Sequence, residues 1–226
     1  MTSDLETTDA SAVAGVRALI GQPDYPCLGA RSVFNQDRAT VRVFARLAGD
    51  GVALEVLREL DAFARSTDVN EGFASFVAVF REPELHSEKQ FEQLLWAQLR
   101  QLHEADGEPW NPAVSADPGD PHFAFSVAGT AFFIVGLHPL ASRIARRAPL
   151  PTLVFNLHQQ FEQLRSSGRF PRMRDTIRRR DQALQGSINP MVADHGTVSE
   201  ARQYSGRVVP GGWEAPWGAP DGGAAQ

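Results

Sequence analysis

The sequence is short of cysteine and of long apolar runs. Cys27 is the one cysteine in 226 residues, which excludes an internal disulfide and fits a protein of the reducing cytoplasm. No apolar run approaches the roughly 18 residues that a membrane-spanning helix needs. The polar, acidic start of the chain also differs from a secretory signal. Neither GxGxxG nor GxxxxGK[ST] occurs, so we expect no loop of these types for a flavin, a nicotinamide or a nucleotide.

Positive charge is scarce in the first part of the chain and concentrated in the second. Residues 1–130 carry 10 basic against 20 acidic side chains, and residues 131–226 carry 12 against 7. Lys89 is the one lysine among the 22 basic residues, and the arginine fork suits carboxylates and phosphates. Because the arginines alternate with carboxylates and no nucleic-acid motif is present, we do not expect a nucleic-acid partner.

The spacing of apolar residues predicts one α/β (α+β mixed) domain over residues 9–209, with a central mixed sheet flanked by helices. Residues 1–8 are expected to be disordered, and 210–226 to form a flexible tail rich in Gly and Pro. The long loop 106–121 could cover a pocket. Helices are expected at 10–20, 52–65, 88–105, 157–165 and 173–184, and strands at 40–47, 73–80, 122–127, 132–137 and 150–155.

Two apolar runs, 132–137 and 150–155, are each followed within three residues by a histidine, His138 and His158. If these strands lie side by side and parallel, both imidazoles emerge at one carboxyl edge, where open α/β sheets bind ligands. Three arginines lie between the runs and would suit a metal or an anionic cofactor there. The alternative is a pair of hydrogen-bonded loop histidines beside a solvated arginine face. The arginines are Arg143, Arg146 and Arg147.

The lone thiol, Cys27, stands in the punctuated segment YPCLG. A free cysteine is most often a small buried hydrophobe. A thiolate ligand would need a positive, partly open setting, and Arg31 is the nearest cation in sequence. Both interpretations stay open, with the first preferred.

Several long segments resemble the YqcI/YcgG family. They are YPCLG, FEQLLWAQLRQLHE, GTAFFIVGLHPLASRIARR, VFNLHQQFEQLR, IRRRDQALQGSINPM and SEARQYSGR, which together span about residues 25–207. The resemblance implies a haem-dependent N-oxygenase that hydroxylates a nitrogen of arginine or of a related small guanidine or amine in specialised metabolism. It implies haem b as cofactor, with O2 and an external reductant, or peroxide, as oxidant. An electron-transfer partner would then be needed, and a homodimer is one option for the oligomeric state.

Under that resemblance, His158 is the preferred axial ligand, with Phe155 and Phe161 as apolar flanks. His138 then lies on the distal side or behind the ligand, and the alternative exchanges the two roles, with His138 as the axial ligand. Arg143 and Arg147, four apart on an expected helix, would hold the two propionates. Cys27 is the rival ligand, because thiolate ligation favours O–O cleavage.

Two other functions remain open at this point. His138, His158 and Glu162 could form a two-histidine, one-carboxylate iron site without haem. Alternatively, the chain is a haem- or anion-binding module without catalysis, with 106–121 as a partner surface.

The polar segment 185–207 contains the expected substrate site. A cationic guanidinium requires a carboxylate, and the carboxylate of an amino acid requires an arginine or an amide. Glu200 and Arg202 could supply both, with Asn189 and Tyr204 adding hydrogen bonds and Glu200, Tyr204 and His138 taking the catalytic roles. The alternative is a structural coil held by its own side chains.

Overall fold

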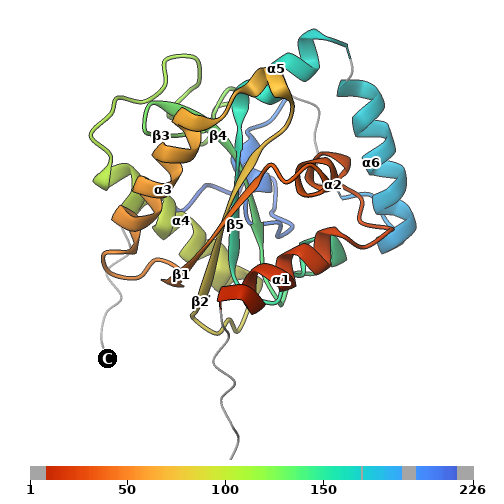
Figure 1. The fold of residues 1–226 in the computed structure, drawn as a ribbon, viewed down its shortest axis with the longest axis horizontal. Coiled ribbons are helices and arrows are strands. Elements are labelled where there is room, and N and C mark those ends of the chain that lie inside the picture. The colour runs from red at the N-terminus through yellow and green to blue at the C-terminus, as the bar shows by residue number, and fades with distance from the viewer. Residues whose placement is uncertain (1–8, 169, 190–196, 218–226) are drawn as a thin grey trace, which may run out of the picture.

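The computed structural model describes residues 9–168, 170–189 and 197–217, in which a five-stranded mixed sheet lies between two layers of helices (Figure 1). The mixed α/β fold with flanking helices is therefore confirmed. Among the described residues, no helix is both long enough and apolar enough to span a bilayer. The strands are β1 (Ala39–Arg46), β2 (Ser75–Glu82), β3 (Phe125–Val127), β4 (Thr130–Leu137) and β5 (Thr152–Leu157), in the order β1-β2-β5-β4-β3.

The relative direction of β4 and β5, the two strands that precede His138 and His158, differs from the prediction. β1 and β2 are parallel, but β5 runs antiparallel to both β2 and β4. The prediction of a parallel β4–β5 pair is therefore wrong. A parallel pair needs a crossover, usually a full helix, whereas the 138–151 connection contains a single 3-10 turn, η2 (Ile144–Arg146). The chain turns back at the end of β4 and enters β5 from that same end.

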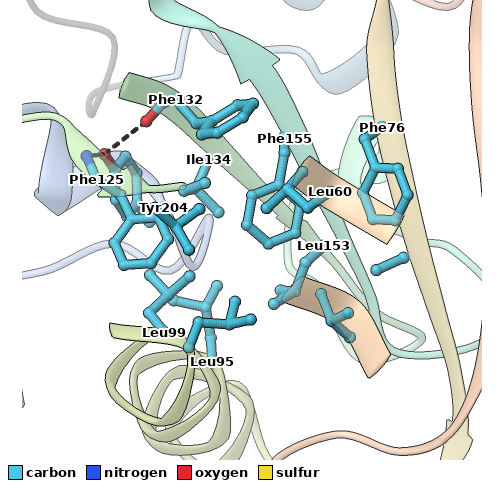
Figure 2. Close-up of a cluster of buried hydrophobic side chains, with 14 of the residues drawn as sticks. Leu60, Phe76, Leu95, Leu99, Phe125, Phe132, Ile134, Leu153, Phe155 and Tyr204 are labelled. Atoms are coloured by element: carbon cyan, nitrogen blue, oxygen red, sulfur yellow. Dashed lines mark hydrogen bonds between the residues drawn. The ribbon is translucent and has the colours of Figure 1, made fainter. Parts of the chain in front are cut away.

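One face of the sheet packs against α3 (Val52–Ser66) and α4 (Glu88–Ala105). Ser87 begins α4 by accepting a hydrogen bond from the Gln90 N–H at 3.0 Å. Apolar side chains of α4 then contact the even-numbered residues of β4 and the odd-numbered residues of β5 (Figure 2). The centre of this layer is fully buried and consists of Leu60, Phe76, Leu95, Leu99, Phe125, Phe132, Ile134, Leu153 and Phe155.

The opposite face is covered by α1 (Asp9–Ile20), α2 (Leu28–Asn35), α5 (His158–Ser166) and α6 (Phe170–Gln185) (Figure 1). Val16 and Ile20 of α1 pack against Val77 and Val79 of β2. The helix α2 was not predicted, since its sequence looks like a turn. Cys27 begins it, because the sulfur accepts a hydrogen bond from the Ala30 N–H at 3.4 Å.

The chain after η3 (Glu200–Gln203) packs back on the core, and η1 (Val69–Glu71) precedes β2. A flexible tail was expected from residue 210 on, but Trp213 and Trp217 contact the aromatic core, with ring centroids 6.2 and 5.8 Å from that of Trp96. Glycine and proline content alone did not reveal these two anchors. Residues 1–8 and 218–226, for which disorder was expected, lie outside the described residues.

Candidate functional site

His138 follows β4 and faces the helix α4. Its imidazole is fully buried and stacks on Phe91, with ring centroids 4.2 Å apart. Neither ring nitrogen has a hydrogen-bond partner among the described residues. Burial, together with Arg146, lowers the pKa of His138 to about 4, although Glu88 opposes the shift. The side chain is therefore a neutral, enclosed imidazole at physiological pH.

His158 lies at the other end of the same strand pair. The register joins Leu137 to Thr152 and Phe132 to Leu157, so the two histidines stand roughly 24 Å apart along the strands, at about 3.4 Å per residue. The expected meeting of both imidazoles at one edge is wrong. His158 Nε2 lies 3.8 Å from a Glu162 oxygen, but His138 cannot complete that iron site, and the described residues contain no cluster of three metal-ligating side chains.

The arginines expected to hold propionates serve the fold instead. Arg143 forms a buried ion pair with Asp181 of α6 and donates to the Ser187 hydroxyl at 2.9 Å. Arg147 Nε donates to the Ala141 carbonyl at 2.7 Å. The segment is not an α-helix, so the two guanidinium groups do not share a helical face. The prediction of Arg143 and Arg147 as a pair on one helix is therefore wrong.

The residues around His158 form what we call the α5 cluster: His158, Phe161, Glu162, Arg165 and Glu200. His158 begins α5 directly after β5, as predicted. One turn later, Glu162 pairs with Arg165, and both groups act electrostatically on Glu200. Phe161 contacts the ring of Phe133 on β4, with centroids 5.6 Å apart. The cluster thus joins α5, η3 and the start of β4.

Glu200 and Tyr204 are directly hydrogen bonded. The Tyr204 hydroxyl donates to Glu200 Oε1 at 2.7 Å and accepts from the Phe125 N–H at 3.1 Å; Figure 2 shows this hydroxyl between Phe125 and Phe132. Burial raises the pKa of Glu200 to about 8, although the Tyr204 hydrogen bond and Arg165 oppose the shift. Glu200 is therefore mostly protonated at neutral pH.

The other predicted substrate residues lie elsewhere. Arg202 donates to main-chain carbonyls of the C-terminal segment, including Pro210 at 2.6 Å, and its guanidinium lies 5.7 Å from the Trp213 ring centroid. The Asn189 N–H donates to Asp181 at 2.9 Å. Of the proposed polar set, the structure brings together Glu200 and Tyr204, and it uses Arg202 to hold the chain end.

A strip of the sheet between α1 and α6 is covered less completely than the opposite face. Val135 and Val154 pack against the α1 layer, yet they are half-buried although β4 and β5 are interior strands. Phe133 and Asn156 share this face and are also half-buried. We call Phe133, Val135 and Val154 the apolar strip. Phe155 points to the opposite face and is fully buried, so it does not flank His158 as predicted.

Two arginines converge beside this face. Arg31 of α2 and Arg180 of α6 both donate to the Pro23 carbonyl. The Nε atom of Arg180 is buried and has no hydrogen-bond partner among the described residues. The pair therefore retains donor capacity for an anionic group.

Cys27 is half-buried and lies close to Arg146 and to the buried Tyr25, which interact with it electrostatically. Burial raises the pKa of the Cys27 thiol, against the opposing effects of backbone N–H groups and Arg146. Burial likewise lowers the pKa of Arg146. The raised pKa favours an uncharged thiol over a thiolate ligand, and the interpretation of Cys27 as a small buried hydrophobe stays a prediction.

A model of the YqcI/YcgG family matches residues 16–218. The chain belongs to this family. It is 24% identical over 189 residues to the uncharacterized protein YqcI of Bacillus subtilis (strain 168), covering 80% of this chain and 74% of that protein. No solved structure matches it.

In this member of the YqcI/YcgG family, sequence reasoning missed two useful features. Alternation along β5 puts Asn156 on the same face as Val154, and its Oδ1 accepts from the Ser75 hydroxyl at 2.7 Å. The period-two pattern of VFNLH could have revealed that polar position. The convergence of Arg31 and Arg180 left no signal, since it depends on how α2 and α6 pack.

Proposed function

We propose that this protein is a haem-dependent N-oxygenase that hydroxylates a nitrogen of a small guanidine or amine. The observation that carries the proposal is the position of His158. His158 begins α5 directly after β5, the strand that carries Val154 of the apolar strip, and its Nε2 atom lies 3.8 Å from a Glu162 oxygen. A cofactor at this strand would then be a neighbour of a cation-binding group formed by Glu162 and Glu200, which interact electrostatically.

In this proposal a haem would be held by one imidazole. His158 would be the axial ligand, with the apolar strip against the macrocycle. Arg31 and Arg180 would take the propionates in place of Arg143 and Arg147, because the Nε atom of Arg180 is buried and has no hydrogen-bond partner within the part of the chain that the structure describes. When bound, the haem supplies the centre at which O2 or peroxide is activated.

Glu200 would bind the cationic head group of the substrate. A buried carboxyl that stays protonated in the free protein gives up its proton readily when a guanidinium approaches, because the ion pair favours the charged form. The Tyr204 hydroxyl holds Oε1 in place, leaving the orientation of Glu200 fixed. The rings of Phe133 and Phe161, which are in contact, would limit the access of water to the same region.

The other candidate ligands fit less well. Cys27 caps a helix as a thiol of raised pKa, which does not favour thiolate ligation. His138 is enclosed against Phe91 at the other end of the strand. We therefore assign His138 to the fold and not to catalysis.

Reconstitution with haemin tests the proposal. We expect a Soret band, and a substrate-dependent shift of that band with a panel of guanidino amino acids. Mass spectrometry should show a product heavier by one oxygen atom when O2 and a reductant, or peroxide, are supplied. A Soret band without product from any substrate would identify a haem-binding module, and absence of the band would reject the proposal.

A further inference from the structure

The helix α6 carries an excess of positive charge. It contains five arginines and two aspartates, and one of these, Asp181, is neutralised by Arg143 from outside the helix. Asp175 is the one remaining acid on α6. The excess contrasts with the chain as a whole, whose net charge is −5. The arginines are Arg172, Arg174, Arg178, Arg179 and Arg180.

This helix spans the face of the sheet that carries the proposed cofactor site. It follows α5, which bears His158, and its last turn reaches η2, where the Ile144 N–H donates to Gln185 at 2.7 Å. Figure 1 shows α6 on the outside of this layer. Arg172 and Arg179 are exposed, whereas Arg180 turns inward toward Pro23. The helix thus lies on the outer side of the layer that contains α5 and His158.

We propose that the outer side of α6 is the docking surface for a small acidic one-electron carrier protein of the ferredoxin type. The inference rests on the proposed function. An N–H group, O2, two electrons and two protons give N–OH and water, so one oxygen atom enters the product and the other leaves as water. Two reduced carriers, each oxidised once, supply the electrons. The sequence has neither the GxGxxG nor the GxxxxGK[ST] loop of a bound flavin, nicotinamide or nucleotide.

Charge complementarity identifies the partner chemistry. A basic patch on an otherwise acidic protein attracts an acidic surface and repels a basic one, which raises the association rate and orients the encounter. The attraction weakens as salt shortens the Debye length. An acidic carrier would therefore approach α6 in preference to the strongly acidic 1–130 portion.

The test compares two double variants of the haem-reconstituted full chain. Arg172→Glu with Arg179→Glu reverses charge on α6. Arg58→Glu with Arg65→Glu makes the same change on α3, across the sheet, where both side chains are 75% exposed. A reduced [2Fe–2S] ferredoxin with its NADPH-dependent reductase drives turnover in one assay, and peroxide drives it in the other. We expect the α6 variant to lose about tenfold or more in ferredoxin-driven kcat/KM at low salt and to keep its peroxide-driven rate.

The outcomes separate this inference from the proposed function. Equal ferredoxin-driven rates in the two variants, or a wild-type rate that does not fall with salt, would overturn the docking surface while leaving peroxide turnover intact. If the α6 variant also loses peroxide-driven turnover, the milder variant Arg172→Gln with Arg179→Gln is compared next. The inference requires that its ferredoxin-driven kcat/KM lie between those of the wild type and the glutamate variant while its peroxide-driven rate stays at the wild-type value. Binding of duplex DNA is measured for the same variants. If the α6 variant loses DNA binding and keeps its ferredoxin-driven turnover, α6 is a nucleic-acid-binding surface and the docking inference is wrong. No product from the wild type with peroxide would reject the proposed function itself.

Discussion

His138 and His158 lie at opposite ends of one antiparallel strand pair. Leu137 is joined to Thr152, and Phe132 to Leu157, so one imidazole leaves each end of the pair. His138 enters the α4 layer, and His158 begins α5. A single cofactor therefore contacts at most one of them, and the two histidines can be tested as a matched pair.

Substitution of His158 by Ala is expected to abolish haem retention. Loss of an outer-shell partner costs roughly 10- to 100-fold in metal affinity, and loss of the ligand itself should exceed that. The measurement is the Soret absorbance after haemin titration and gel filtration. His138→Leu is the control, because it also removes an imidazole but lies at the far end of the strand. Bleaching by His138→Leu with normal binding by His158→Ala would reverse the assignment.

The buried imidazole of His138 should make stability depend on pH. Its pKa is about 4 in the folded protein and near 6.5 when exposed, so the unfolded chain binds the proton first as the pH falls. The free energy of unfolding should therefore decrease between about pH 6.5 and 4, by up to about 1.4 kcal/mol per pH unit. Urea unfolding across this window measures the slope. His138→Leu should flatten it, and an unchanged slope would show that another group titrates.

Features that depend on residues close together in the sequence could be predicted, and features that depend on distant segments could not. Helical spacing in α4 and the helix start at His158 were readable, because caps and apolar periodicity act within a few residues. The contact between Glu200 and Tyr204 was also readable, since the two residues stand four apart in one motif. The direction of β5 was not, because alternation of apolar residues is the same for parallel and antiparallel strands.

Contacts between segments that are distant in the sequence could not be predicted either, because they depend on how the helices pack. Arg31 and Arg180 meet at Pro23 only after α2 and α6 have packed, and nothing in either segment encodes the other. Likewise, Trp213 looked like part of a mobile Gly/Pro-rich end. Its position follows from Arg202, which donates to the Trp213 carbonyl and to the Pro210 carbonyl before it.

Glu200 should act on stability in the opposite direction from His138. Its pKa is raised from 4.5 to about 8, so the folded state holds the proton while the unfolded chain releases it. The contribution is fully present below about pH 4.5 and is lost as the pH rises through 8. Glu200→Gln should therefore be more stable than the wild type at pH 8.5 and similar at pH 4.5, as measured by urea unfolding. The same variant should lose turnover while keeping the Soret band; full activity would remove Glu200 from the substrate site.

The Arg143–Asp181 pair should anchor α6. Both side chains are largely buried, at 7% and 11% exposure, so Asp181→Ala leaves an uncompensated guanidinium and should cost roughly 3–5 kcal/mol. The double variant Arg143→Met with Asp181→Leu should recover most of that loss, because no buried charge remains. Chemical denaturation of the three proteins measures the difference. A double variant no more stable than the single one would show that the pair itself stabilises the fold.

Arg202 should hold the C-terminal segment on the core. Its guanidinium donates to the carbonyls of Val209, Pro210, Gly211 and Trp213, so Arg202→Ala removes a charged donor from several main-chain acceptors. Hydrogen bonds to charged groups contribute roughly 1.5–3 kcal/mol, and partial solvent exposure reduces that to about 1–2 kcal/mol here. Release of Trp213 and Trp217 should shift tryptophan emission to longer wavelength in native buffer. Arg58→Ala, an exposed arginine on α3, is the control and should change neither emission nor stability; an unshifted spectrum in Arg202→Ala would show that the indole contacts alone keep the segment docked.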